Sequence, residues 1–258
     1  MPSNVGMTRG TELAGKVAVV TGGARNIGRA IARALAAGGA SVMVNAKTSR
    51  AQADETVGMI EQAGGKAAVH IADVTDPRAV AAMVEATVQR FGRLDALVNN
   101  AAVRMEAPFE QITLEDWRRV ISSILDSAFV CTQACLPQLI KSGAGTVVNI
   151  GGLTGHRGAT GRAHVISAKA GLAGMTKALA LDLAPHHITV NCVVPGTIDS
   201  QRGLPGVPER PAHRAAPPPI GRRGEPEEVA AMVRMLCGPD ARYITGQAIH
   251  VNGGGYLP

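Results

Sequence analysis

Short apolar runs rich in β-branched residues alternate with longer amphipathic stretches along the whole chain. The runs predict seven strands, over residues 16–21, 41–45, 67–72, 94–99, 145–150, 188–194 and 248–252. The stretches between them have apolar residues at helical spacing and predict helices over 27–37, 50–63, 76–91, 114–141, 163–184 and 225–236. Strands joined by helices of this length imply right-handed crossovers and a parallel sheet.

This alternation predicts one α/β domain, a doubly wound Rossmann-type fold with a parallel seven-stranded sheet and helices on both faces. We expect residues 1–13 to be a flexible leader and residues 14–258 to form the single domain. The stretch 201–220, rich in Pro and Arg, is predicted to be a substrate lid. Ligands of such sheets bind beyond the carboxyl ends of the strands.

Composition narrows the class further. Aromatic residues make up only 2% of the chain, so the core must be built from Ala, Val, Leu and Ile. We find no apolar run long enough to span a bilayer and no secretory signal, which favours a cytoplasmic protein with reduced cysteines and no membrane partner. The net charge of +6 comes from dispersed arginines, which does not indicate nucleic-acid binding.

A glycine-rich turn follows the first predicted strand, at Thr21-Gly22-Gly23-Ala24-Arg25-Asn26-Ile27-Gly28. Its glycines would let the backbone approach a pyrophosphate, and the N-terminus of the next helix would supply N–H groups. The sequence therefore predicts a dinucleotide site at Gly22, Arg25, Asn26, Ile27 and Gly28.

Four further motifs follow in order, and with the turn they resemble the short-chain dehydrogenase/reductase family, in particular its 3-oxoacyl-ACP-reductase-like members. The turn resembles TGxxxGxG, with Asn26 in place of the middle glycine; Asn tolerates a left-handed backbone. The resemblance implies adenine contacts at Asp73 and Val74, an NNAG-like segment including Asn100 and Ala101, a PG segment beside the nicotinamide with Pro195, Gly196 and Ile198, and a hydroxyl residue, Ser200, that binds the carboxamide.

Cofactor choice can be argued from the end of the second strand. An acid there would hold the ribose diol of NAD and repel a 2′-phosphate, but the chain reads Asn45-Ala46-Lys47-Thr48-Ser49-Arg50. Arg25, Lys47 and Arg50 are expected to meet a phosphate, with Ala46 and Thr48 beside it. The sequence thus predicts NADP(H) as the cofactor, with no metal.

The resemblance also locates the catalytic residues, and most of them are missing. The family's lysine is Lys169, which is expected to bind the nicotinamide ribose. The tyrosine position, four residues earlier, is Val165; the serine position is Gly152; and the asparagine position is Ile124. Because three of the four side chains cannot hydrogen-bond, the usual proton transfer is not available.

Two residues could take over the proton transfer in place of the missing side chains. His164 is a competent acid/base, but it lies about 140° round the helix from Lys169, against about 40° for a residue four positions away. Lys169 could itself act as a base or amine nucleophile if it is desolvated.

Three functions follow from this reading. The first is an NADP(H)-dependent oxidoreductase acting on a carbonyl or hydroxyl of a small molecule through an atypical site. The second is a lyase, dehydratase or isomerase on the same scaffold, and the third is an inactive NADP(H)-binding partner protein. The resemblance and the long apolar helices over 114–141 and 163–184 also imply a homo-oligomer, a tetramer.

Overall fold

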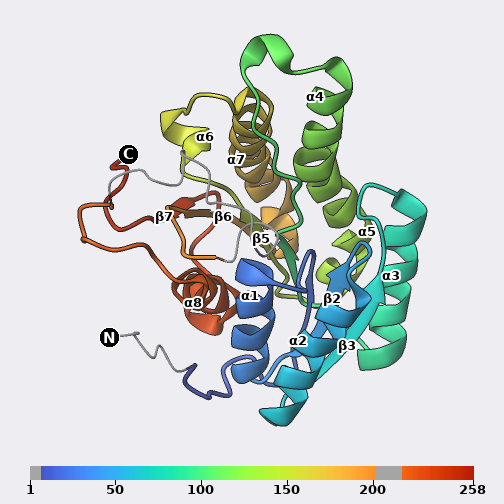
Figure 1. Cartoon of the computed structure of the whole chain (residues 1–258). Coiled ribbons are helices and arrows are strands. Elements are labelled where there is room, and N and C mark those ends of the chain that lie inside the picture. The colour runs from blue at the N-terminus through green and yellow to red at the C-terminus, as the bar shows by residue number, and fades with distance from the viewer. Residues whose placement is uncertain (1–6, 201–216) are drawn as a thin grey trace.

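A single seven-stranded parallel sheet lies at the centre of the molecule (Figure 1). The computed structural model describes residues 7–200 and 217–258, so most of the predicted lid lies outside the described residues. The strand order is β3-β2-β1-β4-β5-β6-β7, and every neighbouring pair is parallel. The strands are β1 Val17–Val20, β2 Ser41–Ala46, β3 Lys66–Ile71, β4 Ala96–Asn99, β5 Thr146–Ile150, β6 Thr189–Pro195 and β7 Ala248–Val251.

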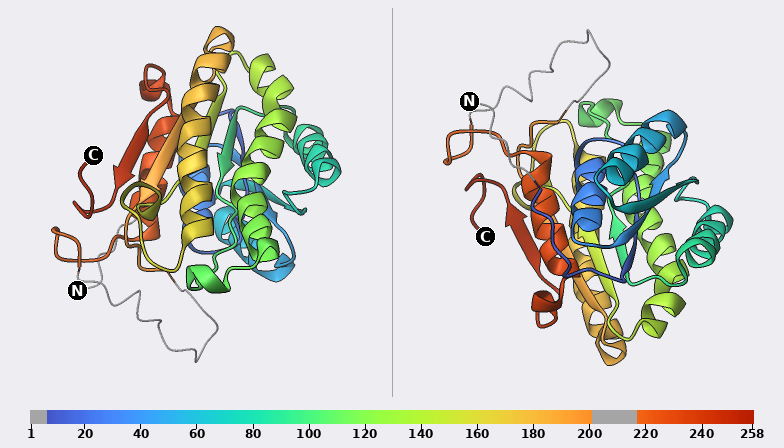
Figure 2. Two further views of the ribbon diagram at one scale, coloured as in Figure 1. Left: turned by 90° about the horizontal axis from the view of Figure 1, so that it is seen from above. Right: turned by 90° about the horizontal axis from the view of Figure 1, so that it is seen from below.

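Helices cover both faces of the sheet, which confirms the predicted doubly wound fold. Their bounds are α1 Asn26–Ala37, α2 Arg50–Gln62, α3 Pro77–Phe91, α4 Leu114–Ile121, α5 Ser127–Lys141, α6 Thr154–Arg157, α7 Ala163–Leu183 and α8 Pro226–Cys237. The two views of Figure 2 show α3, α5 and α7 on one face and α1, α2 and α8 on the other. Asp76 caps α3 through its side chain, as the Asp-Pro pair predicts.

Alternation along the strands divides the core between the two faces. In β1, Val20 packs with the α1 and α8 side, while its neighbour Val19 packs with the α3 and α5 side. Both valines are fully buried. The strands are therefore apolar on both faces, as parallel strands between two helical layers must be.

The sheet reverses its order between β1 and β4, and this reversal places the site. The chain moves outward from β1 to β3 in one half and from β4 to β7 in the other. Doubly wound folds bind nucleotides at such a reversal, beyond the carboxyl ends of the strands, so the cofactor is expected beside the loops leaving β1 and β4.

The predicted helix over 114–141 changes its hydrogen-bonding pattern partway along. Between α4 and α5, residues Ser122–Asp126 form a short stretch of π-helix, the π-turn. By length and composition alone this helix, Leu114–Lys141, could cross a membrane, which the search for uninterrupted apolar runs did not predict. Cys131, Cys135 and Leu139 of α5 instead pack into the core with β4 and α3, as in the core helix of a doubly wound domain.

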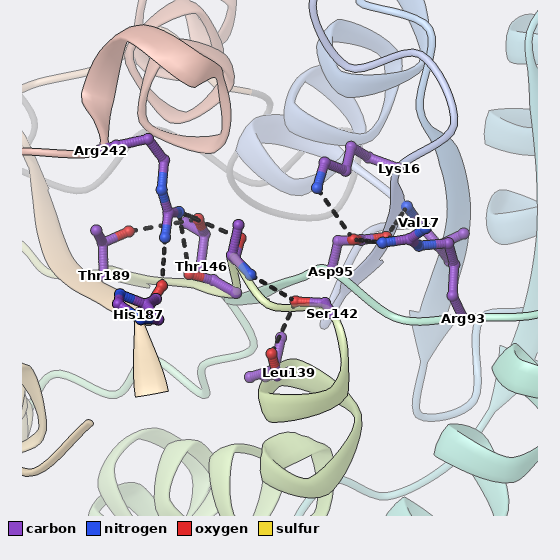
Figure 3. A network of polar contacts seen from close by, with 12 residues as sticks. Lys16, Val17, Arg93, Asp95, Leu139, Ser142, Thr146, His187, Thr189 and Arg242 are labelled. Atoms are coloured by element: carbon purple, nitrogen blue, oxygen red, sulfur yellow. Dashed lines mark hydrogen bonds and ion pairs between the residues drawn. The ribbon is translucent and has the colours of Figure 1, made fainter. Parts of the chain in front are cut away.

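Polar contacts join the amino ends of the strands, at the edge of the sheet opposite the carboxyl ends (Figure 3). Buried Asp95 pairs with Arg93 and Lys16 and accepts the N–H of Val17 at 2.9 Å, which ties β1 to β4. Arg242 donates to the carbonyl oxygens of Ala144 and Gly145, just before β5, and of His187, just before β6. These contacts stabilise the scaffold and leave the carboxyl edge for ligands.

The last part of the expected leader is packed rather than loose. Leu13 is 1% exposed, and its N–H donates to the carbonyl of Gly38. Glu12 pairs with Arg234 of α8. The domain therefore begins before residue 14, because this segment covers the ends of α1 and α8.

Candidate functional site

The glycine-rich turn has the shape of a nucleotide-binding turn. A Cβ placed on Gly28 would lie 2.1 Å from the carbonyl oxygen of Gly22 and 2.6 Å from Asn100 Nδ2, so only glycine fits there. Gly22 has a φ of +61°, which favours glycine. Helix α1 has no acidic residue in its first turn, so nothing there repels an anion. The backbone present fits a dinucleotide pyrophosphate.

Asn26 adopts the left-handed conformation that its place in the motif requires. Its φ is +50°, and the preceding Arg25 is extended and exposed. Ile27, by contrast, is 7% exposed and packs in the core, so only its backbone can face a cofactor.

The side chains of Asn45, Thr21 and Asn100 hold this turn, and only Asn100 was among the predicted site residues. Asn45, buried at the end of β2, accepts from Gly22 N at 3.3 Å and donates to Ala72 O at 3.1 Å. Thr21 Oγ1 accepts from the backbone N–H groups of Asn100 and Ala101. Asn100 Nδ2 donates to the carbonyls of Thr21 and Gly22, both at 3.0 Å. Asn100 and Ala101 therefore support the turn. The role of Asn45 could have been predicted from its position, because it is a polar residue near the buried end of the apolar strand β2.

The end of β2 presents cations, but two of them already have partners. Lys47 pairs with Asp73 at 2.6 Å, and Arg50 pairs with Asp54. Burial alone would raise the pKa of Asp73, but hydrogen bonds from Lys47 and Thr75 hold it below its usual value. Asp73 is thus ionised at neutral pH and lies beside the expected phosphate-binding group. Ala46 and Val74 are buried beside these residues, and Thr48 is exposed.

The Pro195-Gly196 segment lies where β6 ends. A Cβ on Gly196 would lie 2.6 Å from Asn252 Cα, so this glycine lets β7 approach. Gly196 N donates to Val251 O, and Pro195 O accepts from Leu153 N at 3.0 Å. Ile198 is buried and bridges to Gly224, and Ser200 is half-buried at the border of the described residues.

Lys169 is buried beneath the end of β5. It is 7% exposed, and its ammonium donates to the carbonyl oxygen of Ile150. Burial, together with the charge of Arg104, lowers the pKa of Lys169 to about 8; the nearby Cys192 acts slightly in the opposite direction. At neutral pH the group is therefore mostly an ammonium, but one that exchanges its proton readily.

Two of the positions at which the resemblance predicts a missing catalytic side chain lie in one apolar cluster. Val165 is 9% exposed and Ile124 is 2% exposed, and both pack together with Val120, Ala168 and Leu172 where α4 and α7 lie side by side (Figure 1). Ile124 lies in the π-turn, a feature frequently found at functional sites. Gly152 differs, because a Cβ there would meet only Lys169 Cγ, at 3.9 Å.

His164 is fully buried, and neither ring nitrogen has a hydrogen-bond partner. The structure thus gives it no hydrogen bond to Lys169, and it does not cap the helix.

Glu106 and Arg104 of the β4–α4 loop were not predicted from the sequence. Glu106 pairs with Arg162 at the start of α7. Arg104 lies on the same loop and is exposed to solvent. The available signal was the position of this loop, shortly after the NNAG-like segment. In the part of the chain that the structure describes, no cluster of His, Cys, Asp or Glu is arranged to hold a metal.

Comparison with known proteins identifies the family. A family model described as "Enoyl-(Acyl carrier protein) reductase" matches residues 22–255. A 3-oxoacyl-[acyl-carrier-protein] reductase of Synechocystis is 40% identical over 247 residues, covering 95% of this chain and 98% of that protein.

Solved structures agree with this assignment. A dehydrogenase/reductase of Sinorhizobium meliloti has a TM-score of 0.89 at 37% identity and covers 95% of this chain and 96% of that one. A short-chain dehydrogenase of Burkholderia cenocepacia in complex with NADP has a TM-score of 0.87 at 36% identity, covering 95% and 99%. With its nucleotide turn, its parallel sheet and these relatives, the chain belongs to the short-chain dehydrogenase/reductase family of oxidoreductases.

Proposed function

We propose that the protein is an NADP(H)-dependent oxidoreductase that acts on a carbonyl or hydroxyl of a small molecule through an atypical active site. The observation that carries the proposal is the pairing of an intact nucleotide turn with a buried Lys169. The bound cofactor would supply or accept the hydride. Lys169 would bind the nicotinamide ribose, which requires only its charge.

We infer that this chain differs from its family in the group that donates the proton to the substrate. Because Val165, Gly152 and Ile124 offer no side-chain donor, Lys169 is the only titratable group left at the four family positions. Its ammonium, with a pKa of about 8, has a proton to give to an alkoxide near neutral pH. We expect the absence of the tyrosine to lower the rate of reduction of ordinary ketones by roughly 10²–10⁴-fold.

The choice of NADP(H) rests on charge. The residue near the end of β2, where the ribose would bind, is Asn45 and not a carboxylate. Its side chain is turned toward Gly22 and β3. Arg25 and Lys47 are exposed beside the turn. Lys47 must share its charge between Asp73 and a 2′-phosphate, so we expect the preference to be moderate.

We expect NADPH to bind about 10- to 100-fold more tightly than NADH, the range of one charge-assisted contact. Titration of nicotinamide fluorescence measures both affinities. Lys47→Glu should remove the preference, because it places a carboxylate beside the phosphate. The matched control is Lys66→Glu, the same change at the amino end of β3. Equal affinities of the wild type for the two cofactors would refute this preference.

The function itself is tested by following NADPH oxidation with a panel of ketones and aldehydes, and NADP⁺ reduction with the matching alcohols. Slow but saturable turnover is the expected result. Tight nucleotide binding without turnover of any carbonyl would instead favour an inactive NADP(H)-binding partner. The apolar packing of Val165 against Ile124 is the observation that keeps this second candidate open.

We also propose a cytoplasmic homotetramer. Large apolar side chains remain uncovered on the helices that were expected to pair: Leu181 is 79% exposed, Leu114 61% and Phe129 52%. Burying such residues against a second copy would stabilise the assembly. Light scattering at micromolar concentration should give four times the chain mass, and Leu181→Glu should reduce it. A monomeric wild type would contradict this proposal.

A further inference from the structure

A cavity of about 160 Å³ lies where α1 and α2 end side by side (Figure 1). Its lining comes from the ends of these two helices and from the segment that precedes β1. Gly65, which lines it, directly precedes β3, so the cavity lies at the amino ends of the strands. Helix α1 has 12 residues, so about 18 Å separate the cavity from the glycine-rich turn at the other end. The cavity is therefore separate from the cofactor site.

Most of the cavity lining is apolar. Ile60 is 2% exposed, and Met7 and Met59 are half-buried beside it. The other apolar lining residues are alanines, among them Ala36 and Ala63, so their short side chains leave the space open. An apolar cavity of about 150 Å³ is large enough to hold a six-carbon ring. This cavity therefore fits a carbon chain of about that size.

Two arginines, Arg9 and Arg33, complete the lining, and no acidic residue of the described chain is part of it. Arg33 is half-buried on α1. The guanidinium of Arg9 lies at the end of α2, with Nη2 3.2 Å from the position of a Cβ on Gly64. Neither side chain has a hydrogen bond or an ion pair within the described part of the chain, whereas Arg29, also on α1, is paired with Glu55. The cavity thus combines apolar walls with two unpaired positive charges.

The two arginines are not needed to complete the helix ends. Cationic side chains often bind the last carbonyl groups of a helix, but here backbone N–H groups already do so. At the end of α1, carbonyls accept from Gly10 and from residues 38–40; they belong to Ala34, Leu35, Ala36 and Ala37. At the end of α2, carbonyls accept from residues 63–65; they belong to Met59, Ile60 and Glu61. Both guanidinium groups are therefore available to an anion.

We propose that the cavity binds a monocarboxylic acid of about six carbons, with its carboxylate at Arg9 and Arg33 and its chain against Met7, Met59 and Ile60. A guanidinium binds a carboxylate through paired, charge-assisted hydrogen bonds. Each buried methylene of the chain adds affinity. Residues 1–6, which precede Met7, contain no acidic side chain, so charge complementarity favours a separate ligand over this segment. The site is independent of the proposed oxidoreductase function.

The test is a calorimetric titration of hexanoate, hexan-1-ol and acetate into the full chain. Hexanoate should bind at least ten-fold more tightly than hexan-1-ol, which lacks the charge, and than acetate, which lacks the chain. Arg33→Gln should remove the advantage of hexanoate over hexan-1-ol, and Arg33→Lys should retain part of it. The matched control is Arg78→Gln, the same change at an exposed position on α3, which should bind hexanoate like the wild type.

A second variant fills the cavity. Ala63→Leu should weaken the binding of hexanoate and of hexan-1-ol alike, by ten-fold or more, because the larger side chain takes up the space for the carbon chain. Ala51→Leu, the same change at the exposed start of α2, should leave both affinities unchanged. Saturation with NADPH should also leave hexanoate affinity unchanged, since the two sites lie at opposite ends of α1.

Several results would overturn the assignment. Equal affinities for hexanoate and hexan-1-ol would contradict recognition of the charge, and unaltered binding in Arg33→Gln or Ala63→Leu would place the ligand elsewhere. Competition between hexanoate and NADPH would assign the acid to the cofactor site. Binding that appears only after deletion of residues 1–6 would assign the cavity to that segment. A lower mass of Arg33→Gln in light scattering would assign it to a second copy of the chain.

Discussion

Gly28→Ala is expected to weaken NADPH binding by more than 100-fold, a loss above about 2.7 kcal/mol. The added Cβ would lie 2.1 Å from the carbonyl oxygen of Gly22 and 2.6 Å from Asn100 Nδ2. Neither atom can move freely, because Asn100 Nδ2 is bonded to both Thr21 and Gly22. The turn must therefore open, and its N–H groups would no longer converge on a pyrophosphate.

Gly58→Ala is the matched control. Gly58 also lies within a helix, α2, but a Cβ there meets nothing within 4 Å. This variant should bind NADPH like the wild type and unfold at the same temperature or higher. Circular dichroism of Gly28→Ala verifies that the fold persists. Wild-type affinity in a folded Gly28→Ala would show that the nucleotide does not bind at this turn.

The sequence predicted what depends on local pattern. Strand runs, the Asp76 cap and the left-handed Asn26 each follow from nearby residues, and the structure confirms them. The parallel direction of the strands and the helices on both faces followed from the rules for crossovers.

What the sequence could not predict depends on contacts between distant segments. Lys47 and Asp73 follow different strands, β2 and β3, and their pairing offsets part of the positive charge expected beside the cofactor. Leu13 was assigned to a loose leader because its burial depends on α1 and α8. In each case a partner far along the chain decides the role.

Packing bears on the two positions at which the resemblance predicts a missing tyrosine and a missing asparagine. The side chains present there, Val165 and Ile124, fill one cluster together. Reversing one without the other leaves either a phenol in a space shaped for valine or an amide against apolar neighbours. The two positions should therefore be restored as a pair, and their effects should not add independently.

Restoring the family set should raise reduction of neutral ketones by about 10²–10⁴-fold, the usual contribution of a positioned acid. The variant is Gly152→Ser with Val165→Tyr and Ile124→Asn. The serine fits, because a Cβ at position 152 lies 3.9 Å from Lys169 Cγ. The tyrosine stands one helical turn before Lys169, whose positive charge would lower the phenol pKa. Overpacking at position 165 should cost about 1–3 kcal/mol of stability, which thermal unfolding measures.

The control is Val165→Phe in the same background, since it adds the ring without the hydroxyl. If phenylalanine raises kcat/KM as much as tyrosine, the gain comes from packing and the acid is not the missing element. If the wild type already reduces ketones at the rate of the restored variant, another group supplies the proton. His164→Ala then decides between its buried imidazole and Lys169. If activity survives this change, His164 is structural, and the proton comes from Lys169, from the substrate or from water.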